Sequence, residues 1–166
     1  MDVQIQRSDE LQRVAELVDE IRIAMLTTEE GDGCLRSRPM STAQMDSNGD
    51  LWFFTSLSSE KVGECEHHRD VNLSFEHIEK HHFLSISGVA QVVRDKEKMK
   101  LLWTPMVQPW FPQGVDDPDV ALLKVTISHA EYWDAPGSVA KRLFGLAKAM
   151  VTGSPEALGE HRKVQM

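Results

Sequence analysis

The chain has 166 residues, of which 41% are hydrophobic, so it is long enough to bury the core of one globular domain. Its formal net charge of -8 and its pI near 5.3 argue against a nucleic-acid binder, which neutralises phosphates with clustered cations. The N-terminus lacks the basic and apolar regions of a signal peptide, and no stretch approaches the roughly 20 apolar residues that span a bilayer, so we expect a soluble, cytoplasmic protein without a membrane partner.

The first predicted element is an amphipathic helix that ends near Ile21. Apolar residues recur with a helical period from Leu11, and Ser8 is the predicted N-cap, followed by two acidic residues. From Ile23 the pattern changes to short apolar runs separated by turn residues, which is typical of antiparallel sheet. We therefore predict strands at 23–28 and 35–45.

A hairpin is predicted at Asn48-Gly49, because this pair accepts the positive φ angles of a tight turn. It joins the preceding strand to an aromatic strand at 51–55, and the two should pair. A short helix capped by Ser58 or Ser59 is then expected to reach His68.

The rest of the chain continues the pattern of short strands and a few helices. Six or seven strands in all predict a mainly β fold with peripheral helices, built as a small closed or nearly closed barrel. We predict one domain over residues 1–152 and a polar C-terminal tail over 153–166. The further predicted elements are strands at 71–75, 83–93, 121–127 and 131–133, a short helix that starts at Asp95, and an amphipathic helix at 138–151.

Cationic residues beside the most apolar strand are the best functional clue. Arg36 or Arg38 lies on one predicted strand, and Lys61 starts a predicted helix. If the hairpin pairs as predicted, Arg38 could lie across from the segment that leads to Lys61. Two cations, several hydroxyls and the free N–H groups of a helix start suit a phosphate monoester. The alternative is that both cations are solvated surface residues.

The aromatic residues have a functional and a structural interpretation. The run 51–55 could present a backbone edge to a flat heterocycle, or it is a buried strand. Trp110 and Phe111 lie in a loop, where exposure would be costly unless a ligand or a second subunit covers them.

Other common site types lack support. The adjacent histidine pairs point in different directions on any regular element, so we expect no metal site. Cys34 and Cys65 are far apart and are expected to be reduced thiols. There is no glycine-rich nucleotide loop and no nucleophile elbow of a serine hydrolase.

Several blocks that follow one another along the chain carry a family resemblance. They are 28–33, 36–40, 51–56, 59–61, 71–73, 85–88, 102–103, 110–114, 116–118 and 130–134. Over about residues 10–137 the chain thereby resembles the general stress protein branch of the pyridoxamine-phosphate-oxidase-like family. The resemblance implies a six-stranded antiparallel split β-barrel that forms a homodimer and binds FMN in two equivalent interface clefts.

The resemblance also implies roles for individual residues. Arg38 and Lys61, helped by Ser59, would hold the FMN phosphate. Phe53, Phe54 and Thr55 would lie along the isoalloxazine ring, with Pro39 and Met40 lining the cleft and Trp110 closing it from the partner subunit. The chain departs from the oxidases at Glu60, where they carry a basic residue, and in its C-terminal segment, where they grip the substrate phosphate with an arginine and a histidine.

By this resemblance the leading expectation is an FMN-dependent oxidoreductase of unknown substrate, with FAD as an alternative flavin. No catalytic acid or base is assigned. A non-enzymatic flavin carrier or sensor of the stress response is a second hypothesis. Oxidation of pyridoxamine 5'-phosphate is a third, and haem or deazaflavin binding is known among relatives of this barrel.

Overall fold

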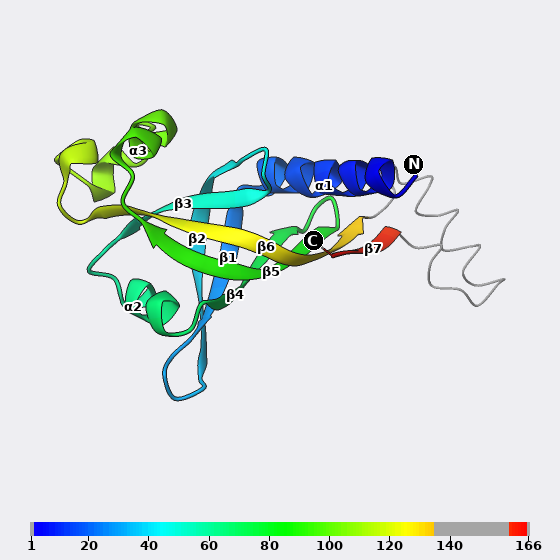
Figure 1. Ribbon diagram of the computed structural model, residues 1–166, viewed down its shortest axis with the longest axis horizontal. Helices are drawn as coiled ribbons and strands as arrows, with labels where there is room; N and C mark the ends of the chain where they lie inside the picture. Colours follow the sequence, from blue (N-terminus) through cyan, green and yellow to red (C-terminus); the bar gives the residue numbers. More distant parts are fainter. Residues whose placement is uncertain (1, 135–159, 166) are drawn as a thin grey trace.

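Six antiparallel strands form a closed barrel in the computed structural model, which describes residues 2–134 and 160–165. The strand order is β3-β2-β1-β4-β5-β6, and pairing between β3 and β6 closes the ring (Figure 1). This arrangement confirms the predicted mainly β, six-stranded antiparallel barrel. The strands are β1 (Ile23–Glu29), β2 (Leu35–Met45), β3 (Asp50–Ser56), β4 (Asp70–His77), β5 (His82–Val93) and β6 (Val120–Asp134).

The barrel core follows from alternation along the strands. In β1, for example, Ala24, Leu26 and Thr28 are buried, whereas Ile23 and Met25, which alternate with them, are exposed. A strand sends successive side chains to opposite faces, so one face fills the barrel and the other forms its outer surface. The fully buried large side chains of the interior include Leu26, Leu51, Phe53, Leu73, Phe75, Leu84, Ile86 and Leu123.

Two of the predicted strands are one continuous strand. The predicted strands 121–127 and 131–133 both belong to β6, which pairs with β5 along its length. The register shifts where Gly88 faces Ile127 while Ser87 faces His129, so Ser128 is the extra residue of a β-bulge. The polar residues 128–129 therefore interrupt the apolar pattern without ending the strand.

The N-terminal helix covers one side of the barrel. Helix α1 (Asp2–Ile21) begins before the predicted N-cap, so Ser8 lies inside the helix. Its apolar stripe of Val14, Leu17 and Val18 is buried in the barrel core, against β2, β4 and β5. Burial of this stripe attaches the helix to the sheet.

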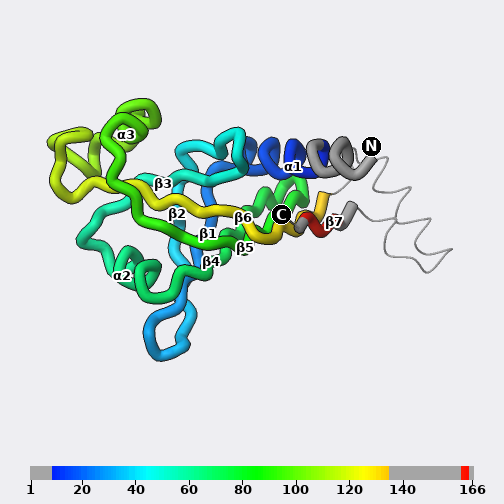
Figure 2. The backbone as a smooth tube through the Cα atoms, viewed as in Figure 1, coloured from blue at the N-terminus to red at the C-terminus, as the bar shows by residue number. Residues whose placement is uncertain are grey.

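Two shorter helices lie toward the end of the barrel opposite the chain termini (Figures 1 and 2). Helix α2 (Glu60–His67) follows β3 and buries Val62 and Cys65. Helix α3 (Lys96–Leu102) belongs to the long excursion between β5 and β6, which also holds the 3-10 turns η1 (Gln108–Trp110) and η2 (Gly114–Asp116). The short helix predicted to start at Asp95 forms, and Asp95 is its N-cap, because its carboxylate accepts hydrogen bonds from the backbone N–H groups of Glu97 and Lys98.

The predicted hairpin forms, but only Gly49 of its Asn-Gly pair has a positive φ, of 85°. The Asp46 carboxylate accepts hydrogen bonds from the backbone N–H groups of Asn48 and Asp50 and from the indole of Trp52 at 2.8 Å. This side-chain acceptor and one left-handed glycine make the turn, so Asn48 needs no strained conformation.

A seventh strand lies within the predicted polar tail. Strand β7 (Glu160–Gln165) pairs with the last six residues of β6, and Val164 is buried. The predicted helix 138–151 lies outside the described residues, and the predicted division at residue 152 stays a prediction. Among the described residues, no helix has the length and apolarity to cross a membrane.

Candidate functional site

The ring of strands is closed, but two neighbouring strands pair over only part of their length and leave a local opening between them. β2 and β3 pair from Thr42–Phe53 to Met45–Leu51. Beyond that point Leu35–Ser41 pairs only with β1, and Phe54–Ser56 only with β6, among the described residues. We call this opening the split. On that side the backbone edges of residues 35–41 and 54–56 have no strand partner among the described residues.

Arg38 lies at the split within a closed triangle of hydrogen bonds. Its Nη1 donates to the Thr28 hydroxyl at 2.6 Å, and its Nη2 donates to Glu64 Oε2 at 2.8 Å. The Thr28 hydroxyl itself donates to the same Glu64 oxygen at 2.6 Å. Strands β1 and β2 and helix α2 each contribute one member, so the triangle joins three elements at one place.

Lys61 lies beside this triangle, at the start of α2. The side chain is half-buried, and among the described residues it has no hydrogen bond or ion pair. Burial, with a smaller contribution from the nearby positive charge of Arg38, lowers the pKa of Lys61. The structure therefore brings the two predicted cations together, and Lys61 makes no direct ion pair with any described residue.

Arg36, the other candidate on this strand, has a different environment. Its guanidinium makes ion pairs with both Glu30 and Glu60 near the protein surface. Glu60 thus has a local partner. Arg36 is neutralised by two carboxylates, so Arg38 and Lys61 are the better candidates for holding an anion.

The segment between β3 and α2 is held in place by Asp119. The Asp119 carboxylate accepts hydrogen bonds from the Ser56 hydroxyl and from the backbone N–H of Ser58, the latter at 2.8 Å. Ser59 is the N-cap residue of α2, but its hydroxyl donates to the Ser56 carbonyl at 2.7 Å rather than capping the helix. These contacts fix the position at which α2 begins, and with it the position of Lys61 in the first turn.

The three predicted flavin contacts on β3 face different ways. Phe53 is fully buried in the barrel core, whereas Phe54 packs edge-on against Trp103 in a second cluster outside it, with ring centroids 5.3 Å apart. A flat ligand in the split would therefore meet the strand edge rather than both rings. Thr55 is buried, and its hydroxyl has no hydrogen-bond partner among the described residues.

The remaining predicted residues are dispersed around the split. Met40 is buried on the inner face of β2 with Arg38, and Pro39 between them is exposed on the outer face, opposite Met25. Trp110 lies in the excursion after α3 and has 73% of its surface exposed. The binding roles of all these residues stay predictions.

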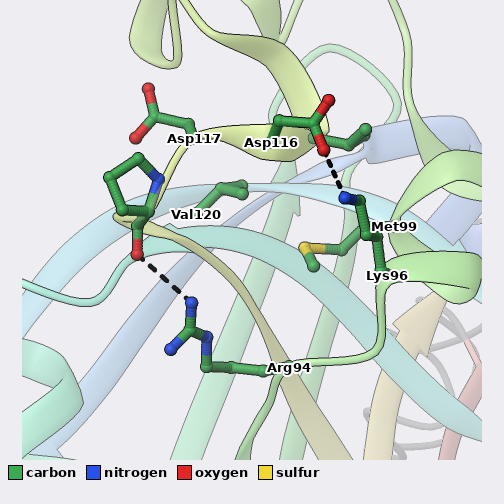
Figure 3. A pocket seen from close by; sticks show the side chains of 8 residues that line it. Arg94, Lys96, Met99, Asp116, Asp117 and Val120 are labelled. Carbon is green, nitrogen blue, oxygen red and sulfur yellow. Dashed lines mark hydrogen bonds and ion pairs between the residues drawn. The ribbon is translucent and has the colours of Figure 1, made fainter.

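A separate pocket lies between the start of α3 and the segment that enters β6 (Figure 3). Met99 and Val120 form its apolar floor, and none of the predicted site residues lines it. On its rim Lys96 makes an ion pair with Asp116, and Arg94 donates a long hydrogen bond of 3.4 Å to the Pro118 carbonyl. These rim groups satisfy one another, so the pocket gives no signal for a ligand.

The other candidate reactive groups are distributed as follows. Within residues 2–134 and 160–165, no cluster of three histidine, cysteine or acidic side chains could hold a metal. Cys34 is an exposed free thiol, and Cys65 is a buried one. Burial, with a smaller contribution from Glu64, raises the pKa of Cys65 to about 11. The Cys65 thiol is therefore protonated and unreactive at neutral pH.

Sequence reasoning missed the role of Glu64 and named Thr28 only as part of a longer block. The alternation of β1 could have shown that Thr28 points inward, as Arg38 does on β2. Nothing in the local sequence of α2 indicates that Glu64, rather than Glu60 or Glu66, meets Arg38. Only the packing of the helix against the barrel end decides this.

Comparisons with known proteins agree with this architecture. The model of the family described as pyridoxamine 5'-phosphate oxidase like matches residues 9–156. The protein bli-3 of Neurospora crassa is 24% identical over 99% of this chain and 83% of its own length.

Two crystal structures are also similar. The general stress FMN/FAD binding protein of Xanthomonas citri is 32% identical, with a TM-score of 0.69, over 79% of this chain and 93% of that one. A Clostridium acetobutylicum protein related to general stress protein 26 is 26% identical, with a TM-score of 0.67, over 75% of this chain and 87% of that one. With a family model that matches most of its length, the chain belongs to the pyridoxamine 5'-phosphate oxidase-like family.

Proposed function

We propose that this protein binds FMN in the split and acts as a flavin-dependent oxidoreductase. The observation that carries the proposal is Lys61, a half-buried cation that makes no ion pair in the described part of the chain and lies beside Arg38. A buried charge is costly unless it is paired. A phosphate ester at this place would supply the missing negative charge, and the Xanthomonas citri relative is named as an FMN/FAD binding protein.

Residues around the split suit the two ends of such a cofactor. In the proposal Lys61 and Arg38 bind the phosphate, with Ser59 near the helix start, and the free edge of β3 at Phe54 and Thr55 orients the ring. Bound flavin would supply the hydride or electron transfer. The protein's part is to hold the ring, exclude water and set the local charge.

A homodimer would complete the site. The outer barrel face that carries Pro39 also exposes Ile23, Met25 and Val89, which have 53%, 41% and 39% of their surfaces accessible. Burial of such apolar groups against a second copy is favourable, and small polar residues such as Ser74 and Ser85 between them allow close approach. Trp110 of one subunit would then cover the flavin bound by the other.

The test is titration of the purified protein with FMN, FAD and riboflavin, followed by absorption spectra and by light scattering for the oligomeric state. We expect a dimer with a perturbed flavin spectrum and tighter binding of FMN than of riboflavin. Changing Arg38 or Lys61 to Ala should weaken FMN more than riboflavin, because only FMN carries the phosphate. Equal losses for both ligands would show that these residues do not bind phosphate.

Turnover is tested separately with the flavin-loaded protein. Oxidation of NADH or NADPH in the presence of common acceptors would support the oxidoreductase. Bound flavin without turnover would instead favour a carrier or sensor. An assay for oxidation of pyridoxamine 5'-phosphate by the flavin-loaded protein tests the alternative that it is a vitamin B6 oxidase.

A further inference from the structure

The hydrogen-bond triangle at Arg38 has a geometry that suits orientation of its guanidinium. Glu64 Oε2 accepts both from Thr28 and from Arg38, and Thr28 accepts from Arg38 in turn. Each of the two Nη atoms thus has a different acceptor. A planar guanidinium held at two of its nitrogens cannot rotate freely, so its plane is fixed relative to the barrel end.

Burial makes this orientation firm. The side chains of Arg38 and Glu64 have only 17% and 11% of their surfaces exposed, and Thr28 is almost fully buried. In these surroundings water competes weakly for the hydrogen bonds. The guanidinium has five N–H groups, and the remaining ones have no partner among the described residues. Arg38 is thus held in place and still has donors to offer a ligand.

The two cations differ in whether a carboxylate pairs with them. Glu64 makes an ion pair with Arg38 at 2.8 Å, whereas Lys61 has no carboxylate within ion-pair distance in the described part of the chain and feels Glu64 only as a more distant charge. Arg38 therefore contributes mainly directed hydrogen bonds, and Lys61 contributes the net positive charge. A single phosphate ester fits this combination of one oriented donor group and one point charge.

We propose that Glu64, together with Thr28, is a positioning residue that presents Arg38 to the phosphate of the bound flavin. This inference rests on the proposed function. It assigns Glu64 a role in selecting phosphorylated over unphosphorylated flavin, although Glu64 is itself an anion and does not touch the phosphate. Its effect is exerted through Arg38.

The experiment measures the ratio of the riboflavin Kd to the FMN Kd for the full-length protein and its variants, by quenching of flavin fluorescence. In Glu64→Gln one amide oxygen can still accept both hydrogen bonds, because both end on the same oxygen in the protein. This variant should keep the wild-type ratio or raise it, since a negative charge is lost. In Glu64→Ala the ratio should fall by about tenfold, because Arg38 loses its acceptor. Glu66→Ala, an exposed glutamate of the same helix, is the matched control and should change nothing.

The outcomes separate the inference from the proposed function. A wild-type protein that binds riboflavin as tightly as FMN overturns the phosphate site and the inference with it. A wild type that prefers FMN, with an unchanged or raised ratio in Glu64→Ala, overturns the inference alone. If Glu64→Ala does not fold, Thr28→Val is the deciding variant: removal of one of the two acceptors should lower the ratio by about threefold, and an unchanged ratio refutes positioning.

Discussion

The unpartnered hydroxyl of Thr55 leads to a prediction about stability that needs no ligand. Thr55 has 3% of its surface exposed, and its Oγ1 has no hydrogen-bond partner within the part of the chain that the structure describes. Valine has nearly the same shape and the same preference for strands, so Thr55→Val removes a buried polar group without leaving a cavity. Protein mutational data put the cost of such an unpaired group at about 1–3 kcal/mol. We expect the free energy of unfolding to rise by about 1–2 kcal/mol.

The same substitution at Thr28 should have the opposite sign. Thr28 is equally buried, but its hydroxyl accepts from Arg38 and donates to Glu64. Thr28→Val leaves both partners short of a hydrogen bond and should lower the free energy of unfolding by about 1–3 kcal/mol. The two variants thus form a matched pair that differs only in whether the hydroxyl is used.

Thermal unfolding of the flavin-free protein, followed by circular dichroism, measures both effects. For a chain of this size 1 kcal/mol corresponds to roughly 2–4 °C in Tm, so Thr55→Val should raise Tm by about 2–8 °C. Thr42→Val, which removes a second buried hydroxyl that has no partner among the described residues, should also raise Tm. A lower Tm for Thr55→Val, or the same sign for Thr55→Val and Thr28→Val, would refute the reasoning from hydrogen-bond satisfaction.

Three further predictions follow from other parts of the structure. A thiol reagent at pH 8 should modify exposed Cys34 but not buried Cys65, whose pKa is about 11, and both should react in denaturant; rapid native labelling of both would contradict the burial of α2. Gly88→Ala should lower the free energy of unfolding, measured by chemical denaturation, by roughly 3 kcal/mol. The new Cβ would lie 2.4 Å from the Thr126 carbonyl oxygen and 2.9 Å from Val125 Cγ1. A variant as stable as the wild type would mean that the backbone at the bulge relaxes easily. The preference for FMN over riboflavin should fade as the pH rises, because Lys61 loses its charge on deprotonation. Burial and the charge of Arg38 lower the pKa of Lys61, so this loss should begin below the ordinary lysine pKa of about 10.4. Lys61→Arg should keep the preference to higher pH.

The local pattern was enough to predict most of the fold. Alternation and turn residues placed the strands, the hairpin at Asp46–Gly49 and the short helix at Asp95, because these depend on neighbours within a few residues. Two predictions about the strands were wrong: β6 was predicted as two strands, and β7 was not predicted. The bulge at Ser128 hides the continuity of β6, and β7 is a short polar strand that forms only because β6 offers it an edge.

For the candidate site, the sequence by itself determined the residue types and the family resemblance, and so the expectation that Arg38 and Lys61 face an anion. Only the tertiary structure decided that Arg38 makes an ion pair with Glu64, whereas Lys61 makes none with any described residue. Glu64 reaches Arg38 because α2 packs at the end of the barrel. β2 and β3 separate beyond Thr42 and Phe53, so the last residues of β3 have no partner in β2. Contacts between groups distant in the chain depend on how whole elements pack, and no local pattern of residues encodes that packing.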